Sequence, residues 1–204
     1  MPRQLSISDY TYDLPDARIA LWPLAQRDAS KLLVYRNGHV DDAVFSQLAT
    51  HLPPDALLVV NNTKVVEARL LFDTAAGARV ELFYLAPAEL LDQAQAMAQT
   101  AALTVKCYIG KAKKWKPEET LIRQDADGGL TLRADMLAKT GDYFTVRLSW
   151  TPEQLPFADV LHRAGKMPLP PYLRRDADAE DAQRYQTVYA RHDGSVAAPT
   201  AGLH

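Results

Sequence analysis

Three stretches of the sequence carry side chains that could bind or transform a ligand. The first is Asn61-Asn62-Thr63, directly after the apolar run 56–60. In open α/β sheets, ligands bind beyond the carboxyl ends of the strands, and amides and a hydroxyl placed there can hydrogen-bond a ribose or a base edge. The same polar residues are also typical of an Asx-type turn that ends a strand, which is the simpler interpretation of their spacing.

The second stretch is the segment 106–116, KCYIGKAKKWK, which holds five lysines and no acidic residue. Lysines neutralise phosphates and aromatic rings stack on unpaired bases, so Tyr108 and Trp115 among these lysines are consistent with an RNA contact. A solvated edge strand protected by lysines has the same composition, and both interpretations stay open. The predicted RNA-binding residues are Lys106, Lys111, Lys113, Lys114 and Lys116.

The third stretch consists of three closely spaced segments near the end of the chain: KMPLPPYLRR (166–175), RYQTVYA (184–190) and GSVAAPTAGLH (194–204). A proline-rich segment is already restricted in its conformation, which suits the wall of a pocket. Small residues in the last segment permit a close approach of the backbone to a ligand. A polyproline docking surface or a simple connector is the alternative for the first segment.

The composition limits the other function classes. With 204 residues, 48% apolar and 24% charged, the chain is typical of a globular protein, and its net charge of −2 excludes a uniformly basic coat for nucleic acid. Cys107 is the single cysteine, so no internal disulfide forms and a reducing cytoplasm is the expected compartment. The N-terminal MPRQLSISDY lacks the apolar core of a signal peptide, and no apolar run is long enough to span a membrane.

The usual motifs of metal and nucleotide chemistry are absent from the sequence. The five histidines, at 39, 51, 162, 192 and 204, show no metal-binding spacing, and one cysteine cannot build a zinc site. The sequence contains no G-x-G-x-x-G, no Walker loop and no G-x-S-x-G. We therefore expect neither a metal nor a redox cofactor.

The elements that position these stretches follow from the pattern of apolar residues. A strand at 31–35 followed by Asn37-Gly38 predicts a hairpin. Apolar spacing predicts a helix over 41–52, and the run 56–60 reads as a buried strand. Later, Thr151-Pro152 predicts the start of a helix that ends at Gly165, and an acidic helix is expected over 178–189.

The middle of the chain has a different pattern of apolar and turn residues. Short strand patterns separated by turn residues indicate a small antiparallel barrel or sandwich over 71–149. The segment 93–102 is either a helical excursion or a mobile loop. The predicted strands of this region are 80–85, 103–109, 120–122, 130–132 and 143–148.

Taken together, these segments resemble a known family. LLVVNNTKVVEARL (57–70), GKMPLPPYLRR, RYQTVYA and GSVAAPTAGLH resemble the S-adenosylmethionine:tRNA ribosyltransferase-isomerases of queuosine biosynthesis. The resemblance covers the whole chain, and Asp9-Tyr10, Leu14-Pro15, Ile19-Ala20, Pro23, Arg27 and Lys31-Leu32-Leu33 carry it near the N-terminus. Family members continue beyond the Ala-Pro-Thr-Ala-Gly-Leu-His motif, so we expect this chain to be an N-terminal portion.

The resemblance implies a fold and a reaction. The fold class is α/β, in the mixed α+β sense, with a discontinuous catalytic α/β barrel-like domain formed by 1–70 and 150–204 and an inserted β-barrel domain at 71–149. The reaction moves the ribosyl group of S-adenosylmethionine onto 7-aminomethyl-7-deazaguanine at the tRNA wobble position, forms epoxyqueuosine, and releases adenine and methionine. The sulfonium acidifies the neighbouring ribose carbon, so a positioned base can remove a proton there.

The resemblance also suggests roles for individual residues. His204 is the expected base or acid, Arg69 and Arg174 would hold a carboxylate or phosphate, and Tyr172 would stack on a ring. The remaining predicted substrate-binding residues are Asn61, Asn62, Thr63, Pro170, Tyr185, Gln186, Thr187, Tyr189 and Thr200. Besides S-adenosylmethionine, the expected partner is a tRNA with a GUN-type anticodon. The protein is expected in the cytoplasm without a membrane partner, and its oligomeric state stays open, with a monomer as the favoured alternative.

Two departures from the family pattern keep other functions open. Lys64, Val66 and Glu67 stand where the family commonly has Arg, a larger aliphatic residue and Pro. A paralogue acting on another acceptor is one alternative. A non-catalytic RNA-binding fragment that retains the β-rich region is the other.

Overall fold

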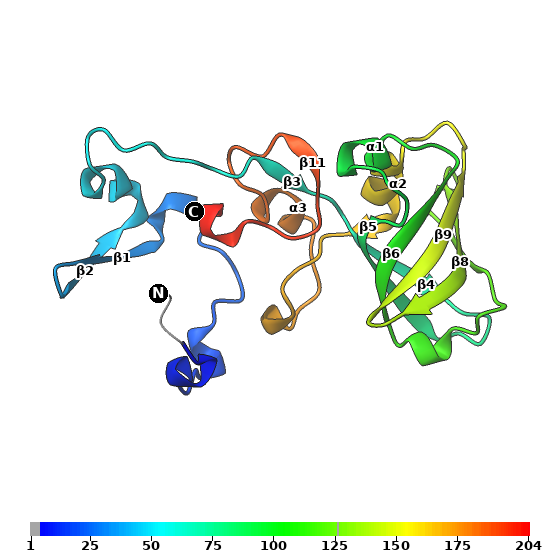
Figure 1. The fold of residues 1–204 in the computed structure, drawn as a ribbon, viewed down its shortest axis with the longest axis horizontal. Helices are drawn as coiled ribbons and strands as arrows, with labels where there is room; N and C mark the ends of the chain where they lie inside the picture. The colour runs from blue at the N-terminus through cyan, green and yellow to red at the C-terminus, as the bar shows by residue number, and fades with distance from the viewer. Residues whose placement is uncertain (1–4, 126) are drawn as a thin grey trace.

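The computed structural model describes residues 5–125 and 127–204, and its largest element is a curled antiparallel sheet. Within these residues the sheet has seven strands in the order β10-β4-β5-β6-β9-β8-β7, and every neighbouring pair is antiparallel. Figure 1 shows the sheet at one end of the molecule. The strands are β4 (Arg69–Asp73), β5 (Arg79–Pro87), β6 (Ala102–Gly110), β7 (Leu121–Gln124), β8 (Thr131–Thr140), β9 (Tyr143–Thr151) and β10 (Gly165–Lys166).

Alternating apolar residues form the core of this sheet. Successive side chains of a strand point to opposite faces, so Val80, Leu82 and Tyr84 of β5 all face inward and are at most 1% exposed. On the neighbouring strand β6, buried Cys107 pairs with Tyr84, and Leu103 and Val105 belong to the same core cluster. The five strands predicted in the middle of the chain are confirmed, and the fold is mixed α+β with few helices.

The sheet is curled into a half-barrel. Strand β4, which only the two-residue β10 flanks on its outer side, lies close to the edge strand β7, and the guanidinium of Arg123 donates a hydrogen bond to the carbonyl of Leu71 at 3.3 Å. The sheet order has no β4–β7 pairing among the described residues, so the Arg123 side chain bridges these two strands. The sheet also extends beyond the predicted segment 71–149, because β4 begins at Arg69 and β10 pairs with it.

Two short helices cover the half-barrel. Phe157, Val160 and Leu161 of α2 (Phe157–Ala164) are fully buried, and the Phe157 ring lies 5.6 Å from that of Trp150. The second helix, α1 (Gln93–Met97), is capped by Asp92, whose carboxylate accepts the Gln95 N–H at 2.8 Å. The segment 93–102 therefore contains a helix before β6.

The helix predicted from Thr151-Pro152 starts later than expected. Thr151 still belongs to β9 and pairs with Thr131, so the chain turns into α2 only at Phe157. The helix ends at Ala164, immediately before Gly165, as the sequence predicted. A Cβ at position 165 would lie well inside contact distance of the carbonyl oxygens of Glu67 and Leu161. Glycine is therefore needed at the point where α2 passes into β10.

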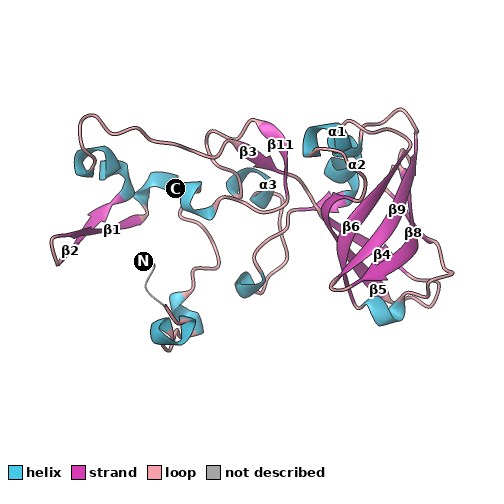
Figure 2. Cartoon of the chain, in the orientation of Figure 1, coloured by secondary structure: helices cyan, strands magenta, loops and turns pink. Residues whose placement is uncertain are grey.

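The rest of the chain carries smaller elements joined by long loops (Figure 2). Strands β1 (Lys31–Arg36) and β2 (His39–Val44) form the predicted hairpin, with Asn37 and Gly38 both at positive φ, as such a turn requires. Strands β3 (Thr63–Val65) and β11 (His192–Ser195) pair in parallel next to α3 (Asp181–Arg184). None of residues 5–64 is buried, so this part has no core of its own.

Three predicted elements of this region are wrong. Residues 41–52 form the end of β2 and a 3₁₀ helix (Phe45–His51) rather than an α-helix, because pairing with β1 extends through Val44. The run 56–60 is extended but unpaired, and Leu57 and Val59 are 90% and 84% exposed. The acidic helix over 178–189 shrinks to α3, because the backbone leaves the helical conformation at Tyr185. The Arg27 side chain binds the carbonyls of Gln183 and Gln186.

Candidate functional site

A cavity of about 270 Å³ lies between the segment 20–30 and the segments near the end of the chain. Its wall brings together residues that are more than 130 positions apart in the sequence, from Ala20 to His204. Five of the predicted site residues line it: Pro170, Tyr172, Tyr185, Thr200 and His204. The other lining residues are Ala20, Leu21, Trp22, Pro23, Leu24, Arg27, Ser30, Leu169, Leu173, Arg175, Asp181, Arg184 and Leu203.

One side of this cavity is held by an ion pair under an aromatic ring. The Arg175 guanidinium donates to both carboxylate oxygens of Asp181, at 2.6 and 2.8 Å, and lies 3.9 Å from the centre of the Trp22 ring. Hydrogen bonds from Arg175 hold the pKa of the Asp181 carboxyl below its ordinary value. A bidentate pair stacked on an aromatic ring keeps its geometry, so it fixes the relative positions of three chain segments.

Arg27 fixes the opposite side of the cavity. Its guanidinium donates to the carbonyls of Leu203 and Gln183, at 3.1 and 3.2 Å, and also to that of Gln186. Burial lowers the pKa of Arg27, and neighbouring Arg184 lowers it further. The Arg27 guanidinium nevertheless donates hydrogen bonds to carbonyl groups of two separate segments, 183–186 and Leu203. These bonds connect α3 to the C-terminal turn.

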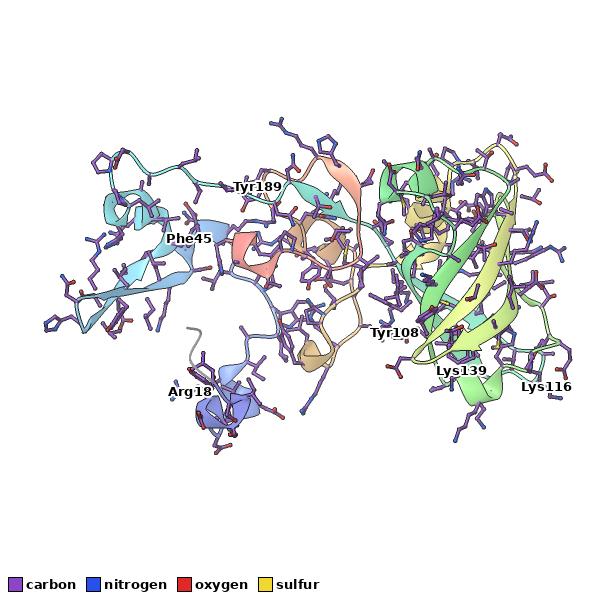
Figure 3. The ribbon with its side chains drawn as sticks, in the orientation of Figure 1. Arg18, Phe45, Tyr108, Lys116, Lys139 and Tyr189 are labelled. Carbon is purple, nitrogen blue, oxygen red and sulfur yellow. The ribbon has the colours of Figure 1, made fainter. Side chains whose placement is uncertain are left out.

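Aromatic and imidazole rings are available within the cavity. The His204 ring lies 5.1 Å from that of Phe45, which Figure 3 labels beside the C-terminal segment. Burial raises the pKa of the Tyr185 hydroxyl, and the adjacent Tyr172 adds to this effect. Such a surface can bind a flat heterocycle by stacking while the imidazole exchanges a proton.

A second cavity, of about 390 Å³, contains both predicted anion-binding arginines. Arg69 is already paired with Glu81, with nitrogen–oxygen distances of 2.5 and 3.1 Å, and lies 3.5 Å from Asp176. Glu81 raises the pKa of Arg69 through this pairing. Arg174 binds Asp16 at 2.8 Å on the surface. An anionic ligand would have to displace or share these carboxylates.

The Asn61-Asn62-Thr63 stretch forms a turn at the start of β3. The Asn61 side chain accepts the backbone N–H of Thr63 at 2.9 Å, which is the geometry of an Asx turn. The carbonyl of Asn62 accepts the N–H of Arg191 at 2.8 Å. These contacts position β3 against β11, and none of the three residues lines the first cavity.

The segment 186–189 packs behind the first cavity. Thr187 is buried, and its hydroxyl has no hydrogen-bond partner among the described residues. Tyr189 contacts Gly202 so closely that a Cβ at position 202 would overlap the tyrosine oxygen. The side-chain amide of Gln186 binds the backbone of Val65. These predicted contact residues thus form a supporting layer, and a role in substrate binding stays a prediction.

The predicted RNA-binding lysines separate into different surroundings. Lys111, Lys113 and Lys114 lie together at the end of β6, whereas Lys106 is on the outer face with its Nζ 5.5 Å from the Tyr143 ring. Trp115 is buried and donates to the carbonyl of Glu119 at 2.7 Å. Its ring therefore anchors the loop and cannot stack on a base, although Tyr108 remains half exposed.

In the described part of the chain, no three His, Cys, Asp or Glu side chains gather as metal ligands would. Burial raises the pKa of Cys107 to about 12, so this thiol stays protonated in the core. Among the same residues, no helix has the length and apolar composition needed to cross a membrane.

Comparison with known proteins identifies the family. Residues 7–204 match the sequence model of a family described as queuosine biosynthesis protein. The chain belongs to this family. Two relatives described as S-adenosylmethionine:tRNA ribosyltransferase-isomerase support the assignment. That of Azoarcus sp. (strain BH72) is 42% identical over 200 residues and that of Geotalea uraniireducens (strain Rf4) is 38% identical over 202.

Both alignments cover 98% of this queuosine-family chain but only 52% and 54% of the relatives. The chain thus spans about half the length of the curated relatives it matches. A solved S-adenosylmethionine tRNA ribosyltransferase from Thermotoga maritima is 28% identical, and the match covers 76% of this chain and 47% of that chain. Its TM-score of 0.30 is too low to inform the fold.

Sequence reasoning missed four cavity residues in this family member: Trp22, Arg27 as a structural clamp, Arg175 and Asp181. Arg27 and Arg175 both lay in segments that carried the family resemblance. The only available signal was their occurrence in those segments, because the carbonyls that Arg27 binds and the Trp22 ring beside Arg175 lie far away in the sequence. The Arg27–Gln186 contact, for example, joins residues 159 positions apart.

Proposed function

We propose that the protein containing this chain is an S-adenosylmethionine-dependent tRNA ribosyltransferase-isomerase. The enzyme transfers and isomerises the ribosyl group of S-adenosylmethionine onto 7-aminomethyl-7-deazaguanine in tRNA, and releases adenine and methionine. The family match over residues 7–204 carries this proposal. Identities of 38–42% over nearly the whole chain support it.

In this proposal the first cavity receives the heterocyclic part of a substrate. Tyr172 and Tyr185 provide ring faces, and Thr200 and His204 stand at the same wall. His204 acts as the base or acid next to the ribose carbon that the sulfonium activates. Arg27 and the Arg175–Asp181 pair hold the wall in place, so that the reacting groups meet in a fixed geometry.

The second cavity is the proposed site for an anionic group of the substrate. Arg69 and Arg174 both line it, and a carboxylate or phosphate could replace the contacts that Asp176 and Asp16 make with them. Both of these aspartates are well exposed, so displacing them costs little. The polar side chains of Asn61, Asn62, Thr63, Gln186, Thr187 and Tyr189 belong to the same proposal as contacts or supports.

We also propose the domain arrangement that accompanies this function. Residues 1–70 and 150–204 contribute to a larger α/β barrel-like catalytic domain, and 71–149 form the inserted β-barrel domain. The exposed apolar run 56–60 supports this arrangement, because such a segment is expected to be covered in a complete domain. We further propose that the tRNA substrate has a GUN-type anticodon and that the enzyme acts as a monomer in the cytoplasm.

The test incubates the complete protein with S-adenosylmethionine and tRNA that carries 7-aminomethyl-7-deazaguanine. We expect adenine release and a new epoxyqueuosine nucleoside in the digested tRNA, both measured by liquid chromatography with mass spectrometry. The control is the same tRNA with unmodified guanine at the wobble position. Absence of both products with folded protein would refute the proposal.

The lysine-rich segment supports a second candidate function, that of a non-catalytic RNA-binding protein. Lys111, Lys113 and Lys114 are all exposed and lie on one surface. In that case the protein would bind tRNA in the same experiment but release no adenine.

A further inference from the structure

The lysine-rich segment forms one wall of a groove of about 480 Å³. Lys113 and Lys114 belong to the 3₁₀ helix after β6 (Ala112–Lys114) and Lys111 precedes it as the N-cap. Lys139 faces them from the β8–β9 hairpin together with Asp142 and Phe144. Figure 3 labels Lys139 at this end of the half-barrel. We call these six residues the lysine groove. Lys139 was not recognisable from the sequence because it lies 23 positions beyond the lysine-rich segment 106–116.

Both walls of the lysine groove are held by contacts with the half-barrel. Lys111 adopts a left-handed backbone conformation, with φ of 58°, and its carbonyl accepts the Lys114 N–H at 2.8 Å. Buried Trp115 anchors the next residue of this wall. On the other wall, the Lys139 ammonium lies 5.6 Å from the centre of the Phe144 ring. The lysines therefore project from backbone that is already ordered.

The charge of the lysine groove is not neutralised within the protein. Four lysines and one aspartate line it. Within residues 5–125 and 127–204, no carboxylate oxygen lies within 4.0 Å of the ammonium group of any of these four lysines. All four side chains are exposed. With a net charge of only −2 on the whole chain, this groove is a local positive surface.

We propose that the lysine groove binds the phosphate backbone of RNA, with Lys139 as a contact opposite Lys111, Lys113 and Lys114. Lysines act as point charges and lack the paired geometry that arginine offers to a single phosphate, so four lysines spread over two walls suit a chain of phosphates. The identification of this RNA as tRNA rests on the proposed function. The groove lies outside both cavities, so it holds the RNA away from the reacting base.

The experiment measures binding of a fluorescent tRNA to the protein by anisotropy over a series of salt concentrations, without S-adenosylmethionine. We compare the wild type with Lys111→Ala/Lys139→Ala and with a control of equal charge, Lys31→Ala/Lys166→Ala, which alters exposed lysines of β1 and β10. Each lost phosphate contact lowers the salt slope by roughly 0.7 to 0.9, so the groove variant should lose about 1.5. Its affinity should fall at least about tenfold at about 0.1 M salt.

Lys111→Arg/Lys139→Arg keeps the charge and should keep both the affinity and the slope. An unchanged slope in the alanine variant, or an equal loss in the control, would overturn the proposal. So would a groove variant that loses binding to phosphatidylserine vesicles while its RNA binding is intact. Thermal unfolding of each variant confirms that the fold is kept.

The same data separate this inference from the proposed function. Salt-dependent RNA binding through the groove without adenine release would uphold the groove and refute the transferase. Adenine release together with unaltered RNA affinity in the groove variants would uphold the transferase and refute the groove.

Discussion

Gln186 and Val65 are joined by two hydrogen bonds. The Val65 N–H donates to the Gln186 side-chain oxygen at 2.8 Å, and the Gln186 side-chain nitrogen donates to the Val65 carbonyl at 2.7 Å. The amide thus takes the place that a neighbouring strand would have beside β3. It links the segment behind the first cavity to the strand that leads into the half-barrel.

Replacing Gln186 by alanine should therefore destabilise this link. Val65 is 1% exposed, so its N–H and carbonyl would lose their partners without gaining water. We expect a loss of about 2–3 kcal/mol in the free energy of unfolding, measured by urea denaturation, and faster hydrogen exchange at the Val65 amide. Gln183→Ala, which shortens an exposed side chain of α3, is the control. Equal effects of the two changes would show that the paired bonds contribute nothing.

Asp181→Asn should lower the free energy of unfolding by an amount that depends on pH. Arg175 lowers the pKa of Asp181 in the folded state, so the pair stabilises the fold above the unfolded carboxyl pKa of about 3.9 and loses this effect as pH falls towards the folded value. The side chains of Arg175 and Asp181 are only 12% and 6% exposed. The variant should lose about 3 kcal/mol at neutral pH.

Urea denaturation between pH 3 and pH 7 measures this difference, which should shrink at the acidic end. Asp55→Asn changes an exposed carboxylate of a loop and serves as the control. A difference between wild type and Asp181→Asn that is constant over the whole pH range would contradict the ion-pair explanation.

Gly165→Ala should disrupt the junction between α2 and β10. The added Cβ would collide with the carbonyl oxygens of Glu67 and Leu161, and backbone atoms cannot rotate away. We expect a loss of about 3 kcal/mol, seen as a lower thermal midpoint. Gly110→Ala is the matched control, because its Cβ would meet the nearest atom, Glu81 Cβ, at 3.4 Å. A melting curve like that of the control would show that the junction adapts.

His204→Ala tests the proposed role of the imidazole in the complete enzyme. Removal of a general base or acid should lower kcat for adenine release by about 10²- to 10⁴-fold, with little change in tRNA affinity. His39→Ala, in the exposed hairpin strand β2, is the control. Unchanged turnover would remove His204 from the mechanism. A fall in tRNA affinity alone would instead assign the ring to binding.

Local stereochemistry explains which elements the sequence predicted well. The hairpin turn at Asn37-Gly38 needs two residues that tolerate positive φ, and the chain offers them between two strand-forming segments. The strands of the half-barrel were visible because one face is buried and the other is not. The prediction of a buried strand over 56–60 is wrong because a strand needs a neighbouring strand to pair with. The described residues offer this run no such partner.

The candidate site was predictable by segment but not by contact. The sequence located the proline-rich stretch and the final loop, and the structure brings Tyr172, Tyr185 and His204 to one cavity. Asn61 and Gln186 looked equally suited to a ligand. Their side chains instead bind the protein's own backbone.

From the sequence alone come the family resemblance, the alternation that builds the half-barrel, and the turn residues, because each depends on neighbours along the chain. Only the tertiary structure showed where the charged side chains lie. Arg175 pairs with Asp181, Arg27 binds distant carbonyls, and Lys139 lies across a groove from the lysines after β6. A polar side chain can satisfy its hydrogen bonds with a ligand, with water or with the backbone, and only the folded chain determines which of these is within reach.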